Sequence, residues 1–120
     1  MKEATPPTSE SAEKWEVQLR KGSLELAILA ALWEGRLYGL EILRHLENNS
    51  DLIVVEGTVY PLLNRLRTLG LVESEWVESE FGHPRKYYRL TRSGKEMLEA
   101  LYKRYPLLEK LIPSPEVENA

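Results

Sequence analysis

The stretch from Glu56 to Thr91 constrains the fold of this 120-residue chain more than any other. Apolar residues recur along its first part at the spacing of one helical face, and Gly70 follows at the position where a left-handed residue ends a helix. Residues 71–78 then alternate between polar and apolar side chains, which is the pattern of a half-exposed strand. After a turn, residues 85–90 supply a second strand. These features predict a helix followed by a β-hairpin.

The predicted helix has two different faces. Thr58 is its expected N-cap, and Pro61 is expected in the first turn, where a missing N–H costs little. Its apolar face comprises Val59, Leu62, Leu63, Leu66 and Leu69. Its polar face carries Tyr60, Asn64, Arg67 and Thr68, with Arg65 at the edge. A hydroxyl, an amide and guanidinium groups therefore replace the usual mixture of Glu and Lys.

The residues before this stretch supply apolar cover. Residues 12–20 are compatible with a helix, which Gly22 is expected to interrupt. Residues 23–33 form a helix that is apolar in every direction, so a second copy of the chain is expected to cover the side that the domain leaves open. Residues 37–47 predict a further helix, and residues 52–55 an extended connector.

Thr91 or Ser93 is expected to open a last helix with an apolar stripe, and Pro106 to kink or break it. The order of elements predicts a mainly α fold with a small β-hairpin, namely a winged helix-turn-helix with an added C-terminal helix. The expected divisions are a flexible arm at residues 1–11, the winged domain at 12–91, the added helix at 92–112 and a flexible tail at 113–120.

Composition excludes several classes of site. The chain has no cysteine, so disulfides, thiolate metal sites and cysteine nucleophiles are excluded. His45 and His83 lie far apart in sequence, and neither indicates a metal site. No nucleophile, base and orienting group stand at a usable spacing, so neither an enzyme nor a cofactor is expected. No apolar run approaches the ~18 residues that span a bilayer, and we expect a cytoplasmic protein.

Charge is distributed unevenly along the chain. The formal net charge is −3, which argues mildly against binding of nucleic acid. However, cations gather in the central stretch, at Arg65, Arg67, Arg85, Lys86, Arg89 and Arg92. The same stretch contains Glu73, Glu75, Glu78 and Glu80. These acids are explained if the first strand is the outer edge of the hairpin, where they also discourage pairing with other strands. Trp76 of that strand is expected in the core.

Two sequence segments together resemble the PadR family of bacterial and archaeal transcriptional regulators. They are GTVYPLLNRLRTLGLVESEW at residues 57–76 and GHPRKYYRLTRSGKEML at residues 82–98. KGSLELAILAALWEGRLYGLEILRHLE at residues 21–47 is similar to the opening helices of that family, so the resemblance covers about Lys21 to Leu111. It implies a short-form homodimer, usually a repressor, that binds an inverted-repeat operator and dimerises through its first long helix and its last helix. The turn at residues 80–84 departs from the glycine-rich basic tip of many members, and Glu80 there would repel phosphate.

The polar face of the helix suits recognition of DNA bases. Arg can bond the two acceptors of guanine, and Asn the donor and acceptor of adenine. Asn64 and Arg67 are therefore the candidates for base contacts, with Thr68 beside them, and Tyr60 is a candidate for a phosphate contact. The alternative for this face is an ordinary solvated surface. Arg65 has a second candidate role, an ion pair with a carboxylate such as Glu41 or Glu73.

Arg85 and Lys86 are the candidate phosphate contacts of the hairpin, since a wing lies along the DNA backbone; the alternative is a charged strand end. Four aromatic residues are candidates for a site that accepts a small aromatic or phenolic effector at the dimer interface: Trp15, Trp33, Tyr102 and Tyr105. The alternative for them is packing between subunits. The alternative for the whole chain is a winged-helix module that binds a protein partner without DNA.

Overall fold

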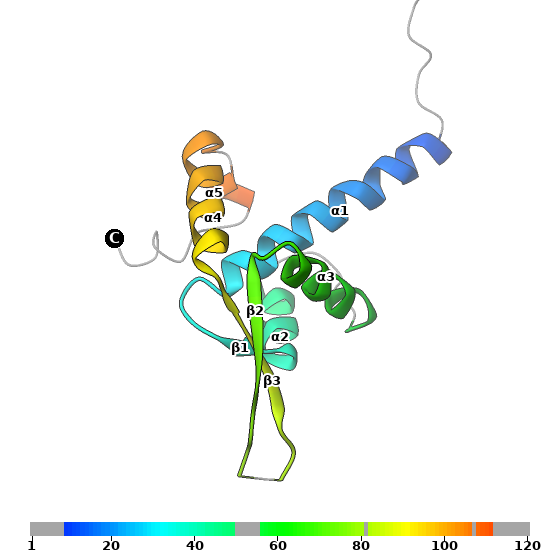
Figure 1. Ribbon diagram of the computed structural model, residues 1–120. Coiled ribbons are helices and arrows are strands. Elements are labelled where there is room, and N and C mark those ends of the chain that lie inside the picture. The colour runs from blue at the N-terminus through cyan, green and yellow to red at the C-terminus, as the bar shows by residue number, and fades with distance from the viewer. Residues whose placement is uncertain (1–8, 50–55, 81, 107, 112–120) are drawn as a thin grey trace, which may run out of the picture.

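The computed structural model describes residues 9–49, 56–80, 82–106 and 108–111, and over these it has the predicted mainly α architecture with a small sheet (Figure 1). The elements are α1 (Ser9–Ala31), β1 (Leu37–Tyr38), α2 (Gly39–Asn49), α3 (Glu56–Thr68), β2 (Val72–Val77), β3 (Arg85–Leu90), α4 (Arg92–Arg104) and α5 (Leu108–Leu111). The expected connector at 52–55 and the tail at 113–120 lie outside the described residues. No helix among the described residues is both long and apolar enough to cross a membrane.

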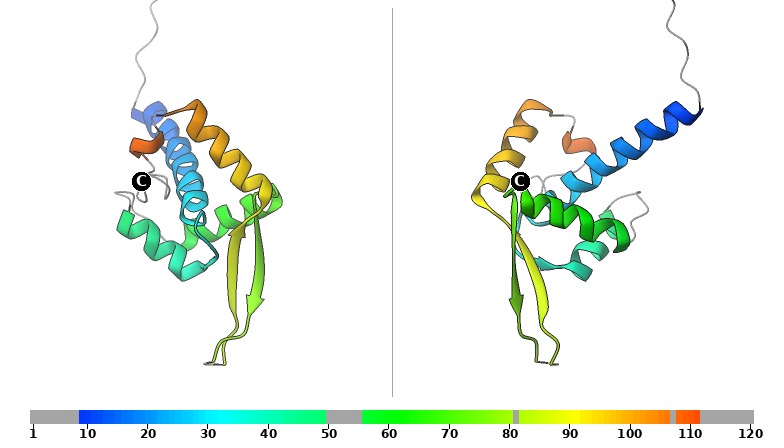
Figure 2. Two further views of the ribbon diagram at one scale, coloured as in Figure 1. Left: turned by 90° about the vertical axis from the view of Figure 1, so that its left-hand side faces the viewer. Right: turned by 45° about the vertical axis from the view of Figure 1, so that its right-hand side comes forward.

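α1 is one continuous helix, so the expectation that Gly22 would interrupt it was wrong. A glycine inside a helix costs only about 1 kcal/mol, and burial of Leu24 and Ile28 just after it offsets that cost. Residues 9–11 belong to α1 as well, which shortens the expected flexible arm. The outer half of α1 projects away from the rest of the molecule (Figures 1 and 2).

The core lies where the inner half of α1 meets α2, α3, α4 and the base of the sheet. Its fully buried side chains are Leu24, Ile28, Leu29, Leu32, Ile42, Leu46, Val59, Leu63, Leu66, Val72 and Leu98. Most directions of the apolar helix at 23–33 are thus covered within one chain. Leu26, Ala27 and Trp33 are partly buried against the same core.

The expected helix at residues 37–47 begins two residues later. Leu37 and Tyr38 form β1, which pairs with β3 through Leu37↔Tyr88 and Tyr38↔Tyr87. The backbone N–H of Tyr38 donates to the Oε1 atom of Glu41 at 3.1 Å, so the side chain of Glu41 satisfies a donor just before α2. A two-residue strand that pairs with a distant segment leaves no periodic pattern in the sequence, which is why it was not predicted.

α3 begins at Glu56, so Thr58 lies inside the helix and is not its N-cap, and Pro61 falls beyond the first turn. The predicted end at Gly70 is confirmed: its φ is +77°, the N–H of Gly70 donates to the carbonyl of Arg67, and that of Leu71 donates to the carbonyl of Leu66, each at 3.0 Å. This pair of bonds is the Schellman arrangement. Leu69 was wrongly assigned to the apolar face, because the turn leaves it 55% exposed.

The three strands are antiparallel in the order β1-β3-β2, so the acidic strand β2 is an edge strand, as predicted. Glu73 accepts a hydrogen bond from Arg89 at 2.7 Å and Glu75 one from Arg36 at 2.8 Å. Trp76 is 68% exposed, and the expectation that it lies in the core was wrong. Val72, on the same face of the strand, is buried in the core, whereas Trp76, four residues further along, lines an open groove.

Thr91 is the N-cap of α4, which is one of the two positions predicted for the start of this helix. Its hydroxyl oxygen accepts from the N–H of Gly94 at 3.1 Å and its hydroxyl donates to the carbonyl of Gly70 at 2.6 Å. The predicted break at Pro106 is confirmed, because α4 ends at Arg104 and the short α5 follows. Within the described residues, the segment at 92–112 thus contains two helices, α4 and α5.

Candidate functional site

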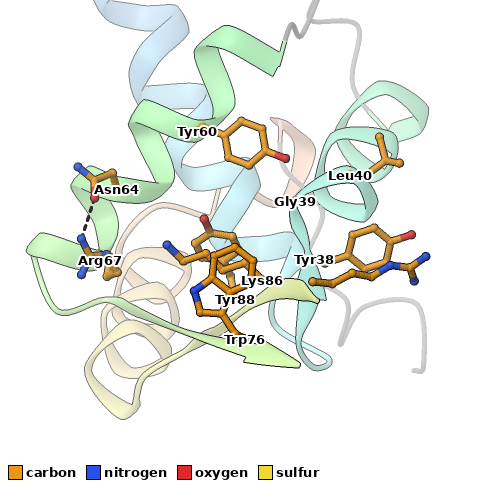
Figure 3. Close-up of a pocket in the computed structure, with 10 residues that line it drawn as sticks. Tyr38, Gly39, Leu40, Tyr60, Asn64, Arg67, Trp76, Lys86 and Tyr88 are labelled. Atoms are coloured by element: carbon orange, nitrogen blue, oxygen red, sulfur yellow. Dashed lines mark hydrogen bonds between the residues drawn. The ribbon is translucent and has the colours of Figure 1, made fainter. Parts of the chain in front are cut away.

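A groove of about 560 Å³ lies between α3, the start of α2 and the β2–β3 hairpin (Figure 3). Its lining residues are Tyr38, Gly39, Leu40, Tyr60, Asn64, Arg67, Trp76, Arg85, Lys86 and Tyr88. None of these residues carries a carboxylate, while three carry a cation. The groove gathers five of the seven residues that the sequence predicted for DNA contact, and leaves out Arg65 and Thr68.

The exposed face of α3 presents an amide and a guanidinium that already bond to each other. The Nη2 atom of Arg67 donates to the Oδ1 atom of Asn64 at 2.8 Å, across one turn of the helix (Figure 3). Both residues are exposed. The hydroxyl of Thr68 donates to the carbonyl of Asn64 at 3.0 Å. The base-contact candidates thus stand on a regular helix with their orientation set by short-range bonds.

Tyr60 lies directly over the start of α2 because residue 39 is a glycine. A Cβ atom at Gly39 would come within 2.4 Å of the hydroxyl oxygen of Tyr60, and Gly39 is itself buried. The hydroxyl of Tyr60 points into the groove (Figure 3). Burial raises the pKa of Tyr88, and Tyr60 raises it further while Arg67 lowers it. Tyr88 therefore keeps its proton and presents a neutral hydroxyl in the groove.

Aromatic rings hold the cations of the hairpin. The guanidinium of Arg85 lies 4.6 Å from the centroid of the Tyr38 ring, and the Nζ atom of Lys86 lies 5.8 Å from the centroids of both Trp76 and Tyr88. At exposed positions each such contact contributes about 0.5–1 kcal/mol. The side chains are therefore oriented more than ordinary surface cations, and both line the groove.

The middle of the hairpin is stabilised by a second set of aromatic and cationic groups. Tyr38 meets Tyr87 edge to face with ring centroids 5.6 Å apart, and the guanidinium of Arg36 lies 4.6 Å from the centroid of Tyr87. Arg36 also donates to Glu75 of β2. This chain of contacts joins the residues before α2 to both strands of the hairpin.

Arg65 lies outside the groove, where it forms an ion pair with Glu25 of α1. The predicted alternative role as an ion-pair partner is thus present, but the partner is neither Glu41 nor Glu73. The side chain of Glu25 is only 18% exposed, so the pair is partly shielded from water. It connects the helix that carries the candidate base contacts to α1.

The four aromatic residues predicted for an effector site do not meet within one chain. Trp15, 71% exposed, stands on the outer half of α1, about 24 Å of helix from the end at Ala31, near which Trp33 is partly buried. Tyr102 of α4 is partly buried, and burial and then Glu109 raise its pKa to about 12. Tyr105 is 56% exposed.

The sequence missed Tyr38, Gly39, Leu40, Trp76 and Tyr88 as groove residues. Trp76 had a usable signal: it stands four residues along the strand from Val72 and close to the turn, so a protruding hairpin would expose it. Gly39 had none, because its role depends on a ring from α3. Within the described residues no group of three His, Asp or Glu side chains could hold a metal ion.

Comparison with known proteins gives a consistent result. Residues 28–100 match the model of the transcriptional regulator PadR-like family. A PadR-like transcription factor from Bacteroides fragilis is 43% identical with a TM-score of 0.70, over 81% of this chain and 93% of that chain. A PadR-like transcriptional regulator from Bacillus cereus is 34% identical with a TM-score of 0.67, over 78% and 90%. Bacillus subtilis PadR, solved in complex with operator DNA, is 28% identical with a TM-score of 0.59, over 64% and 44%.

Proposed function

Because the chain belongs to the PadR-like family of transcriptional regulators, we propose that it binds operator DNA in the groove between α3 and the β2–β3 hairpin. The family assignment confirms that the protein is a regulator and not an enzyme. One observation carries the proposal for the site: the groove brings an amide and a guanidinium on α3 together with two cations on β3, and none of the described residues that line it is acidic.

In this proposal α3 enters the major groove of DNA. Asn64 and Arg67 are exposed on the side of α3 that faces the groove, and each can bond two atoms of a base edge. A good pair of this kind discriminates against the wrong base by about 1–3 kcal/mol. Thr68, one turn after Asn64, extends the same face, and Arg65 supports it at the margin through Glu25.

Arg85 and Lys86 bind phosphates in this proposal, with Tyr60 donating its hydroxyl to a third. The acids of β2 do not cancel these cations, because Glu73 and Glu75 are each bonded to another arginine, Arg89 and Arg36. Contacts of this kind fix the position of the protein on the duplex and weaken as salt concentration rises.

We infer that the protein acts as a homodimer on an inverted repeat, and as a repressor. The exposed apolar side chains of the outer half of α1, Trp15, Val17 and Leu19, support a second copy of the chain as their cover. A twofold dimer presents two copies of α3 and so matches two half-sites of opposite direction. Occupancy of such a site near a promoter by a dimer blocks transcription.

A small aromatic effector is the regulatory part of this proposal. It would bind where the dimer brings Trp15 and Tyr105 near Trp33 and Tyr102, and it would release DNA. Titration with phenolic acids and planar dyes, followed by tryptophan fluorescence, tests this; absence of a response over a broad panel would contradict it.

Three alanine variants test the DNA interface. Asn64→Ala and Arg67→Ala are expected to lose discrimination between the operator and unrelated duplexes, because they remove base contacts. Arg85→Ala is expected to weaken binding to all duplexes. It should also reduce the slope of log affinity against log salt concentration by about one, as expected when one phosphate contact is lost. Fluorescence anisotropy with an operator selected from genomic fragments, at several salt concentrations, measures both effects.

The three changes are all on exposed side chains, so circular dichroism of each variant should match the parent. If all three variants bound the operator as the parent does, the assigned face would be wrong. If the parent showed no salt-dependent binding to any fragment, the alternative of a winged-helix module for a protein partner would replace the proposal.

A further inference from the structure

Trp76 is a large apolar side chain that lines the groove together with three cations, Arg67, Arg85 and Lys86. It is 68% exposed, although its strand partner Lys86 and the ring of Tyr88 lie beside it. An exposed indole forgoes the stabilisation of burial, and it contributes little to the core at this distance along the hairpin. Because the indole also lines the groove of the proposed DNA site, it is available to a partner outside the chain.

The indole occupies the hairpin wall of the groove, and Asn64 and Arg67 occupy the α3 wall (Figure 3). Trp76 is the cross-strand neighbour of Lys86, so a ligand that fills the groove and contacts both the α3 residues and the hairpin cations lies within reach of the indole. The cations Arg85 and Lys86 stand on β3, whereas Trp76 stands on β2, the edge strand. Trp76 thus supplies the apolar part of a wall whose remaining groups are charged or hydroxylic.

We propose that Trp76 contacts DNA. Its indole packs against a deoxyribose of the DNA strand that lies between α3 and the β2–β3 hairpin. This rests on the proposed function. A DNA backbone alternates phosphates, which the cations bind, with sugars, whose apolar faces gain from burial against a ring. The contact carries no base information, so it adds to the affinity for every duplex.

A second explanation has to be separated from the first. The Nζ atom of Lys86 lies 5.8 Å from the Trp76 ring, so the indole could act only by orienting that cation. If so, removal of Trp76 would have no effect once Lys86 is uncharged. A direct contact instead predicts the same loss in both backgrounds.

The test uses Trp76→Ala, Trp76→Phe, Lys86→Met and the double variant with Trp76→Ala and Lys86→Met. Trp76→Ala is expected to lower affinity about tenfold for operator and unrelated duplex alike, without change in the salt dependence, because an apolar contact releases no counterions. Trp76→Phe keeps a ring and should retain most of the affinity. Leu69→Ala removes another exposed apolar side chain, outside the groove, and is the matched control.

Fluorescence supplies a direct readout. The parent has three tryptophans, and addition of DNA should change its emission. That change should be largely absent in Trp76→Phe, which still binds and still contains Trp15 and Trp33. The double variant should bind about tenfold more weakly than Lys86→Met.

Parent-like affinity of Trp76→Ala, or no further loss in the double variant, would overturn the contact, and so would an equal emission change in Trp76→Phe. In those cases loss of discrimination in Arg67→Ala would leave the proposed function standing. Absence of DNA binding by the parent itself would overturn both.

Discussion

Gly94 leaves no room for a side chain. A Cβ atom at this position would lie 2.1 Å from the carbonyl oxygen of Leu71, an atom of the backbone that cannot turn away. The same carbonyl accepts from the N–H of Thr91, and the N–H of Gly94 donates to the Thr91 side chain. We predict that Gly94→Ala lowers the free energy of unfolding by about 2 kcal/mol or more, because the first turn of α4 must move.

Urea denaturation of the parent and of Gly94→Ala measures this change. Thr91→Ala is the comparison variant, because it removes the cap and leaves the space at position 94 unaltered, and it should cost about 1 kcal/mol. Equal stability of Gly94→Ala and the parent would mean that α4 can shift away from Leu71 at no cost.

Single residues were the hardest to place from sequence. Val72 and Trp76 share one face of β2, and alternation assigns both to the core, yet one is buried and the other is exposed. Alternation determines the face of a strand, but exposure depends on whether another element lies above that face. That information is tertiary. The error at Leu69 has a local cause instead, because the turn at Gly70 takes this residue out of the helical face.

Among the elements, α1 offers the clearest prediction. Gly22 lies inside it, and a Cβ atom there would meet nothing within 4 Å. We predict that Gly22→Ala raises the free energy of unfolding by up to about 1 kcal/mol, because alanine restricts the unfolded chain and favours the helix.

Thermal unfolding followed by the helical circular dichroism signal checks this prediction. Gly94→Ala is the control, because it replaces another helical glycine and is expected to lower the free energy of unfolding. A loss of stability in Gly22→Ala would show that a second copy of the chain approaches α1 closely at this glycine.

The elements that periodicity and caps define were predictable: the helix ending at Gly70, the two strands of the hairpin and the helix capped by Thr91. β1 was not, because two residues carry no period and owe their conformation to pairing with β3. That α1 continues through Gly22 was also not predicted, again because tertiary packing decides it. The local penalty of Gly22 was visible in the sequence, while the packing that outweighs it was not.

At the scale of the whole molecule, the outer half of α1 exposes Trp15, Val17 and Leu19, with exposed fractions of 71%, 52% and 72%. We predict a dimer in sedimentation velocity at micromolar concentration, and a shift of at least about tenfold in its dissociation constant for Leu19→Glu, which places a charge in the interface. Leu69→Glu makes the same change at an exposed leucine outside α1 and should leave the dimer intact. A monomeric parent would contradict the dimer.

The residues of the candidate site were predictable where the pattern of a single helix or strand exposes them. Tyr60, Asn64 and Arg67 follow from the polar face of α3, and Arg85 and Lys86 from their place after the turn. The other wall of the groove depends on how α2 and the hairpin lie against α3. Gly39 and Tyr38 therefore could not be recognised, and Arg65 could not be matched to Glu25, a residue of another helix 40 positions away.

If Asn64 and Arg67 contact bases as proposed, the hydrogen bond between them makes base recognition an exchange reaction. The free protein already satisfies the amide oxygen of Asn64 and one arm of Arg67 within itself, so a base edge has to replace that internal competitor. A matching base returns two bonds for the one that is given up. In this proposal a mismatched base would separate the pair without replacing its bond, and the polar groups left desolvated without partners would add a second penalty for the wrong sequence.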